Sequence, residues 1–558
     1  MNVAARLEGL AEAGGICISE SAYQQIENKL PLRYEERRKD MKTRKRRMLW
    51  KVTLLVVLGS FFLGSASGFA ASPKGVLKCA FHWGVSADWF DPALPTLGQS
   101  ALYCLMLVHD ALLKSMPGEL YSPCLAESWT ISPDSRVYDF KLRKGVKFHN
   151  GDEMTAEDVV FSFLRYKRGT SAKLINDRIA KVEAVNPYLF RVTFKEPFPN
   201  FLEYFLCGTS TIGWVVPKKY IESVGEAEFR KKPIGCGPYK FVEFKADVGL
   251  VMEAFDGFWR KVPKVKRLEI QIIREPSTRF AMVQRGEVDM ATLMQDVLYE
   301  KVKKEPSLRL LAPFSPTRWV LNWSTQPWDP KSPWADARVR KAASLAVDRK
   351  TLADVHMPGC GPVGGLALDG DPDGLQFPPD PYDPERAKKL LAEAGYPKGF
   401  HGGKLYPFNG PYWPYGEQVA SYWKVVGIEV EIVLLDRPSW IAARRSGQMK
   451  GGAFIDPVEN PTIWSRLEYL FGGVHCYGNY PDIVSAWDQL NKSSDPKVRK
   501  GLIEQIQRLI HDRTMYTVLT STNSPAAFGP KVKGDPYKIQ KPYPIWFMAP
   551  FEDIELNE

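Results

Sequence analysis

The sequence predicts a mixed α/β fold, and three local patterns support that prediction. Apolar and polar residues alternate over 137–142, which is typical of a half-buried strand. Thr155 lies three residues before the acid Asp158, and an apolar helical face follows, which indicates a capped helix. Another helix is predicted over 383–395, with Asp-Pro at its start and Gly at its end, and a strand over 428–434. Helices and strands therefore mix along the chain, as in α/β proteins.

Composition and charge are typical of a globular protein and argue against a nucleic-acid binder. The chain has 558 residues, of which 44% are hydrophobic and 25% are charged, so collagen-like, coiled-coil and wholly disordered proteins are excluded. Its length suggests roughly three or four domain-sized units. The formal charge is +11, but residues 1–70 carry 12 Lys and Arg against 7 Asp and Glu, which leaves 63 against 57 in the rest. Such a small excess of positive charge argues against nucleic-acid binding.

Residues 41–70 have the three parts of a secretory signal peptide. A cationic stretch at 41–48 precedes the 13 uncharged residues Val52–Gly64, and small residues follow from Ser65. We expect cleavage near Ala70 and export to the periplasm. A retained membrane anchor stays open as the alternative, although about 20 apolar residues are needed to cross a bilayer.

Cysteine and histidine usage predicts no metal site and no cofactor. Seven of the eight Cys follow the signal segment, so at least one stays unpaired in an oxidising compartment. No Cys or His has metal-ligand spacing, and we expect mostly buried free thiols.

Residues 1–40 begin with a helix-like pattern that contains Asn2 and, four positions later, Arg6; a predicted strand at Gly14–Ser19 and a second helical stretch from Glu20 follow. This segment resembles the carboxy-terminal end of a class III adenylate/guanylate cyclase domain, and the resemblance assigns Asn2 and Arg6 to the pair that contacts the ribose and the phosphate in that family. The metal-binding aspartates of the family are missing, so we expect a non-functional remnant without cyclase activity. Met41 or Met48 is then the natural start of the exported protein.

Several short segments of 75–558 carry a family resemblance together. The segments are Leu125–Trp129, Ser132–Asp134, Tyr138–Asp158, Ile234–Tyr239, Phe255–Trp259, Gly286–Asp289, Asp336–Ala342, Ala346–Arg349 and Ala387–Pro397. They resemble the family 5 extracellular solute-binding proteins, and all occur in the order of that family. These proteins are the dipeptide-, oligopeptide- and nickel-binding components of ABC importers.

The resemblance implies an α/β, two-lobed, periplasmic-binding-protein-like clamp (type II) with an additional subdomain. The segment 125–158 is expected to fold as a hairpin and a capped helix. Gly235-Cys236-Gly237 is expected to form a turn, because no Lys-Ser/Thr follows it as in a phosphate-binding loop. The expected division is lobe I at 71–112, 235–315 and 525–558, the additional subdomain at 113–234, and lobe II at 316–524.

Aromatic residues supply the first candidate contacts to a solute. Residues 405–415 contain five aromatic rings, three prolines and a glycine, which predicts a stiffened loop rather than a helix. Tyr412, Trp413 and Tyr415 would stack on a solute, or the loop would pack on itself, and both interpretations stay open. Trp83 lies where family members pass the hinge and is a further candidate.

Polar candidates come from two other stretches. Arg318 and Asn322 flank the crossing into the second lobe, where an Arg can pair with a carboxylate end. Peptide-binding relatives hold the ligand's amine with an aspartate, and the matching stretch offers Asp456 and Glu459. Asn460 replaces the acid that usually precedes the proline, which puts a peptide in doubt but allows other cationic solutes.

We therefore expect the periplasmic substrate-binding component of an ABC importer. It would capture a peptide-, opine- or oligosaccharide-like solute between two lobes by a population shift, and deliver it to the permease and ATPase subunits. We expect a monomer, no catalysis and no nucleic-acid partner. The alternatives are a nucleotide cyclase-related protein and a membrane-tethered solute receptor.

Overall fold

The computed structural model describes most of the chain after residue 71. The cyclase-like segment and the signal-like segment lie outside the described residues. Those described are 72–94, 99–116, 119–166, 176–205, 212–295, 297–312, 314–323, 329–408, 412–471, 480–536 and 550–557.

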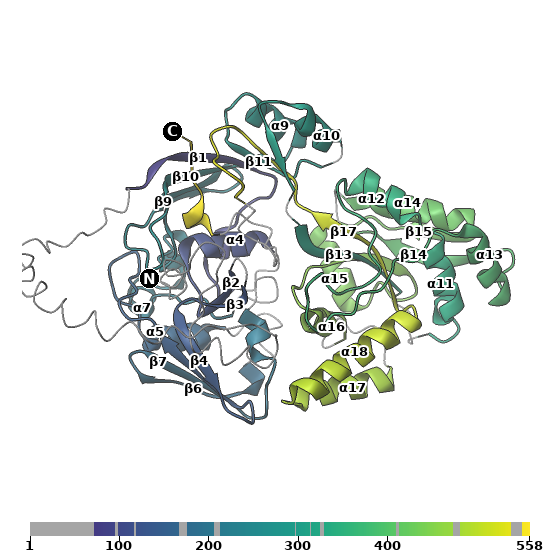
Figure 1. The fold of residues 1–558 in the computed structure, drawn as a ribbon, viewed down its shortest axis with the longest axis horizontal. Coiled ribbons are helices and arrows are strands. Elements are labelled where there is room, and N and C mark those ends of the chain that lie inside the picture. The colour runs from purple at the N-terminus through teal and green to yellow at the C-terminus, as the bar shows by residue number, and fades with distance from the viewer. Residues whose placement is uncertain are drawn as a thin grey trace, which may run out of the picture. The chain divides into compact units, whose positions relative to one another are not determined.

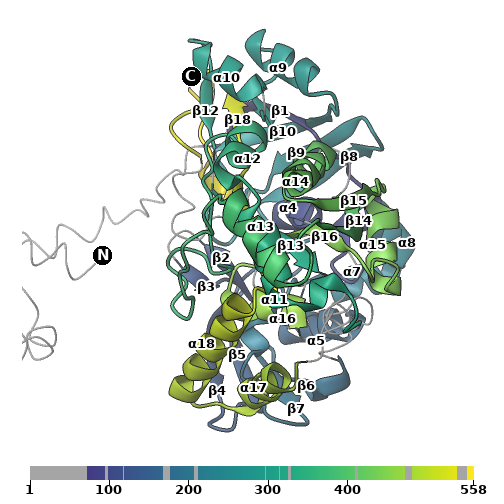
Figure 2. The ribbon, with the colours of Figure 1, turned by 90° about the vertical axis from the view of Figure 1, so that its right-hand side faces the viewer.

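A seven-stranded sheet is built from segments far apart in the sequence, in the order β12-β18-β11-β1-β10-β9-β8. Figure 1 labels β11, β1, β10 and β9, and Figure 2 labels β12, β18 and β8. Strand β1 pairs in parallel with β10 and β11, and the other pairings are antiparallel. The strands are β1 (Lys74–Phe81), β8 (Tyr239–Lys245), β9 (Gly249–Ala254), β10 (Val265–Ile272), β11 (Met290–Thr292), β12 (Arg309–Leu311) and β18 (Ala526–Phe528).

Side-chain alternation along β1 gives this sheet two buried faces. Leu77, Cys79 and Phe81 pack in one apolar cluster with residues of α4 (Gln99–Val108). Ala80 belongs to the cluster on the opposite face, formed with α9 (Pro276–Gln284) and α10 (Val297–Lys304). The sheet is therefore covered by helices on both sides.

A four-stranded antiparallel sheet has the order β4-β5-β7-β6 and confirms two local predictions. The predicted strand 137–142 is β5 (Val137–Leu142). Thr155 caps α5 (Ala156–Arg165) in a capping box, in which Asp158 accepts the Thr155 backbone N–H at 2.9 Å. The other strands here are β4 (Ala126–Ile131), β6 (Ile179–Asn186) and β7 (Leu189–Phe194), and β2 (Leu113–Met116) pairs with β3 (Glu119–Pro123).

The five-stranded sheet has the order β15-β14-β16-β13-β17. Strand β14 is parallel to β15 and β16, whereas β13 is antiparallel to β16 and β17. The predicted strand at 428–434 is β15 (Ile428–Ile432). The others are β13 (Phe314–Trp323), β14 (Phe400–Tyr406), β16 (Ala453–Val458) and β17 (Tyr516–Asn523).

Helices cover both faces of the five-stranded sheet. Trp319 and Leu321 pack with α11 (Ala337–Leu345), α13 (Pro384–Glu393) and α14 (Trp413–Val425), and Figure 2 shows α11 and α13 side by side. The alternate residue Val320 packs with helices of the other face. Those are α16 (Ile463–Phe471), α17 (Pro481–Lys492) and α18 (Pro496–Asp512). Helix α15 (Arg437–Ser446) packs with Phe454 of β16 in a separate apolar cluster. The remaining helices are α7 (Lys218–Val224), α8 (Glu226–Lys231), α12 (Arg349–His356), η1 (Ala87–Phe90), η2 (Phe201–Phe205), η3 (Pro333–Ala335) and η6 (Phe551–Asp553).

The predicted helix at 383–395 is confirmed, but the predicted aromatic loop over 405–415 is wrong at both of its ends, and residues 409–411 lie outside the described residues. Asp383 caps α13 by accepting the Arg386 backbone N–H at 2.9 Å, and Gly395 follows with φ 96°. The segment 405–415 instead ends β14 and begins α14. Pro414 lies in the first turn of α14, where a missing N–H leaves no intrahelical bond unmade.

Gly235 and Gly237 form the expected turn before β8. A Cβ on Gly235 would collide with the carbonyl oxygen of Val108, and the Gly237 N–H donates to that oxygen at 2.9 Å. Close backbone approach therefore explains both glycines.

Among the described strands, two short connections lead from the seven-stranded sheet to the five-stranded sheet and back. Strand β12 ends at Leu311 and β13 begins at Phe314, and β17 ends at Asn523 just before β18 begins at Ala526. Figure 1 shows β13 and β17 side by side where the chain turns toward β11. The mixed α/β class is confirmed, and the exact domain boundaries stay a prediction.

Candidate functional site

Strand β13 holds Arg318 inside the protein. Arg318 lies opposite Val458 of β16 and Ser521 of β17, with 2% of its surface exposed. One guanidinium nitrogen is 3.4 Å from the carbonyl oxygen of Ala367. Burial lowers the pKa of Arg318 to about 10, against the attraction of Asp369. In this structure Arg318 is covered by the chain around Ala367.

Asn322 shares the face of β13 on which Arg318 lies. Its amide nitrogen donates to the carbonyl oxygen of Val320 at 3.3 Å. Its side-chain oxygen is buried without a hydrogen-bond partner among the described groups. Because a buried acceptor without a donor is costly, Asn322 is the polar candidate with the clearest capacity for one more hydrogen bond.

Asp456 of β16 is paired within the chain. Its carboxylate lies 2.5 Å from the Arg444 guanidinium, and both side chains are almost fully buried. The Tyr469 hydroxyl donates to the same carboxylate at 3.2 Å. Burial raises the pKa of Asp456 to about 6, although Arg444 and Tyr469 favour the charged form. A ligand amine would have to share or displace Arg444, so the amine role of Asp456 stays a prediction. Glu459 lies half-buried just beyond the end of β16.

Two of the aromatic candidates, Tyr412 and Tyr415, lie around Trp319, on the opposite face of β13 from Arg318. Tyr412 is half-buried, and its ring centroid is 4.5 Å from that of Trp319. Tyr415 is buried, and its hydroxyl is 2.8 Å from the Thr520 hydroxyl, so it packs in the core. Trp413 is half-buried, and its indole N–H has no hydrogen-bond partner in the described part of the chain.

Trp83 lies next to the seven-stranded sheet. It follows β1 and packs half-buried against Phe81, Tyr103 and Trp89 with ring centroids 4.8, 5.5 and 6.1 Å away. The structure therefore brings Arg318, Asn322 and Asp456 to one face of the five-stranded sheet. It places Tyr412 and Tyr415 on the other face, Trp413 at the start of α14, and Trp83 beside a different sheet.

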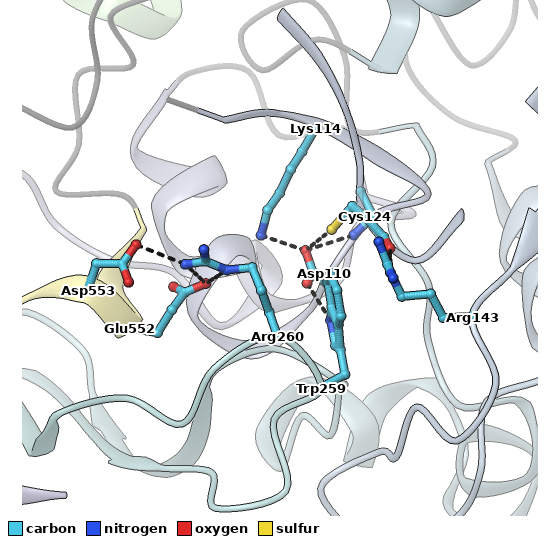
Figure 3. Close-up of polar contacts among 9 residues, drawn as sticks. Asp110, Lys114, Cys124, Arg143, Trp259, Arg260, Glu552 and Asp553 are labelled. Carbon is cyan, nitrogen blue, oxygen red and sulfur yellow. Dashed lines mark hydrogen bonds and ion pairs between the residues drawn. The ribbon is translucent and has the colours of Figure 1, made fainter. Parts of the chain in front are cut away.

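A buried polar network around Asp110 is absent from the sequence-based candidates (Figure 3). The fully buried carboxylate of Asp110 accepts hydrogen bonds from Lys114 Nζ at 2.7 Å, Cys124 Sγ at 2.9 Å and Trp259 Nε1 at 2.9 Å. Trp259 lies in the segment Phe255–Trp259, one of those that carry the family resemblance, and its hydrogen bond to Asp110 gives this segment a structural role. The sequence carries no signal for the network, because Asp110 and Trp259 are 149 residues apart.

Ion pairs beside this network join Arg260, which follows Trp259, to residues 552–553. Arg260 donates to Glu552 at 2.6 Å and to Asp553 at 3.0 Å, as Figure 3 shows. Arg143 lies over the Trp259 ring at 4.6 Å. Segments from three distant parts of the sequence are thus fixed together, which is a structural role.

Neither a helix that could span a membrane nor a cluster of metal ligands occurs among the described residues. No described helix is both long enough and apolar enough to span a membrane. Among the same residues, no group of three or more His, Cys, Asp and Glu side chains is arranged to hold a metal ion. The described cysteines Cys79, Cys104, Cys124, Cys236 and Cys360 are free thiols.

Comparison with known proteins matches the chain over most of its length. Residues 121–456 match the family described as bacterial extracellular solute-binding proteins, family 5 Middle. The chain is 27% identical to heme-binding protein A of Haemophilus influenzae, over 81% of this chain and 88% of that protein. It is 26% identical to the dipeptide-binding protein of Escherichia coli, over 88% and 97%.

Solved structures support the same fold. The substrate-binding protein CtaP of Listeria monocytogenes superposes with TM-score 0.74 at 22% identity, covering 87% of this chain and 100% of CtaP. The protein DppA of Helicobacter pylori, solved with the peptide STSA, gives 0.71 at 24% identity, covering 87% and 98%. With the family match and the three sheets described above, the chain belongs to the family 5 bacterial extracellular solute-binding proteins.

Proposed function

We propose that this protein is the solute-binding component of an ABC importer, which captures a small solute and delivers it to permease and ATPase subunits. The observation that carries the proposal is the pair of short crossings between two helix-covered sheets, at Leu311–Phe314 and Asn523–Ala526. Two adjacent connections form a hinge about which two rigid bodies can rotate. A solute that contacts both bodies then favours the closed arrangement.

The three sheets support the proposed division into lobes. The seven-stranded sheet draws its strands from the ranges assigned to lobe I and the four-stranded sheet from the additional subdomain. The five-stranded sheet comes from lobe II, except that β13 already begins at Phe314, two residues before the proposed boundary. In this division, the solute-facing residues are the half-buried ones: Trp83 on lobe I, and Tyr412, Trp413 and Glu459 on lobe II. Closed solute sites combine such aromatic faces with a few polar groups.

The chemical class of the solute is proposed as peptide-like, opine-like or oligosaccharide-like. The names of relatives and structural neighbours mention different ligands: heme, dipeptides, the peptide STSA and agropinic acid. A solute on the face of the five-stranded sheet opposite to Tyr412 would instead meet the buried acceptor of Asn322, and the buried Arg318 guanidinium could meet a carboxylate there if the chain around Ala367 moves. We further propose that the protein acts in the periplasm as a monomer, exported by residues 41–70, and leaves its solute chemically unaltered.

A thermal-shift screen tests the proposal directly. The purified chain is heated with di- to pentapeptides, opines, oligosaccharides and amines, one at a time. A solute present at 100 times its Kd stabilises the folded state by about 2.7 kcal/mol, which raises the melting temperature by several degrees. Recovery of the unchanged solute by chromatography is expected in the same tubes. Absence of any shift across the panel, or appearance of a product, would contradict the proposal.

A further inference from the structure

An interface joins the four-stranded sheet region to helices of the five-stranded sheet. The 3-10 helix η2 lies beyond β7, and its Phe201 and Phe205 share one apolar cluster with Trp464 and Leu467 of α16. The ring centroids of Tyr204 and Trp464 are 6.0 Å apart. Next to η2, the Asn200 amide donates to the Asn491 side-chain oxygen of α17 at 2.8 Å. These contacts are between side chains, so the two regions can part without breaking secondary structure.

Each side of this interface contributes one glutamate that accepts a hydrogen bond from the other side. Glu203 of η2 accepts a hydrogen bond from the Thr462 hydroxyl, next to α16, at 2.6 Å. Glu468 of α16 accepts one from the Tyr204 hydroxyl of η2. Each carboxyl group is therefore held by a hydroxyl of the opposite region. Both glutamates are half-buried by the contact.

Charged and titratable groups from every neighbouring element face this pair. Arg499 of α18 and Arg178 before β6 favour the ionised acids, whereas Asp371 and the repulsion between the two glutamates oppose ionisation. Desolvation is the largest effect, and it raises the pKa of Glu203 to about 7 and that of Glu468 to about 7. The other groups are Tyr121, which hydrogen-bonds to Glu203, Tyr204, which bonds to Glu468, and Asp373 and Tyr138, which lie near Arg499.

We propose that Glu203 and Glu468 form a proton-operated latch, in which docking of η2 against α16 takes up protons and is released as the pH rises. This inference rests on the proposed hinged function and names a regulation of it. Protonated carboxyl groups keep both hydroxyl contacts without bringing two like charges into one interface. Ionised groups repel each other and prefer water, so they favour separation.

The direction of the pH effect follows from the two states. In the separated state water surrounds both acids, and their pKa values return toward the ordinary value of about 4.3. Below about pH 4 both states are protonated, and the latch is at full strength. As the pH rises from about 4 through 7, the separated state loses its protons first, so docking weakens. Each pKa unit of difference corresponds to about tenfold in the docking equilibrium.

The test uses the full chain without any solute. Small-angle X-ray scattering is recorded from pH 5 to pH 8 at constant ionic strength, for the wild type and for the Glu203→Gln/Glu468→Gln variant. Gln keeps a hydrogen-bonding side chain of the same size but cannot ionise. The matched control is Glu300→Gln/Glu385→Gln, which removes two exposed charges elsewhere.

The wild type and the control should expand as the pH rises, whereas the Glu203→Gln/Glu468→Gln variant should stay compact at every pH. As a second readout, infrared spectra of the wild type should show protonated carboxyl C=O absorption that disappears near pH 7 and is reduced in the variant. A wild type without expansion, or a variant that expands equally, overturns the latch. Because no solute is present, this result is independent of the thermal-shift screen, which alone decides the proposed function.

Discussion

Replacing Asp110 by Asn is expected to destabilise the protein strongly, although no sequence motif marks this residue. Asp110 is fully buried and is the anionic partner of Lys114, whose side chain is 8% exposed. Burial opposes the charge of Lys114, yet attraction to Asp110 raises the pKa of Lys114 above its usual value. Asp110→Asn keeps an oxygen for Trp259 and Cys124 but leaves the ammonium without its carboxylate.

The magnitude follows from the burial of both partners. Removing one member of a buried ion pair costs about 3–5 kcal/mol, because the other charge stays buried and uncompensated. The Asn side chain retains some hydrogen bonding, so we expect a loss near the lower end, about 3 kcal/mol. Asp139→Asn is the matched control, since Asp139 and Arg191 form a partly exposed ion pair of 2.6 Å. Such pairs contribute at most about 1 kcal/mol.

Urea unfolding followed by circular dichroism measures these losses, and Lys114→Met completes a double-mutant cycle. Asp110→Asn/Lys114→Met should recover more than half of the stability lost in the Asp110→Asn variant, because no unpaired charge remains. The reasoning is refuted if Asp110→Asn costs no more than Asp139→Asn, or if the two single losses simply add.

Three further substitutions separate binding from packing. Trp413→Ala should lower solute affinity and leave the ligand-free melting temperature unchanged, and the reverse pattern would make the ring a packing residue. Tyr415→Phe should do the opposite, costing about 1 kcal/mol for its hydrogen bond to Thr520 with unchanged affinity in calorimetric titrations. Asp456→Asn should weaken a cationic solute more than a neutral one, and equal losses would leave Asp456 only its pairing with Arg444.

Local features of the fold were predictable because they depend on neighbouring residues. The strand at Val137–Leu142 follows from alternation, and the helices after Thr155 and Asp383 follow from their capping residues. The sequence argument fails at the ends of the aromatic segment 405–415, because prolines exclude a helix only beyond its first turn. Pro414 lies in the first turn of α14, the one part of a helix that accepts proline.

The polar pairings were not predictable, because they join residues far apart in the sequence. Arg444 lies on α15 and reaches Asp456 on β16, and Glu203 meets Thr462 from 259 residues away. Periodicity and spacing report which face of an element is apolar, but not which elements meet. The sequence alone therefore predicts that Asp456 is available to a ligand, whereas in the fold its carboxylate pairs with the Arg444 guanidinium.

The central claim is that two bodies joined by paired crossings close around a guest molecule. Scattering from the chain, with and without a saturating concentration of the solute found by thermal shift, tests this most directly. The radius of gyration should fall when the solute is bound, because the bound form populates the closed arrangement. Superimposable curves at full occupancy would contradict the claim.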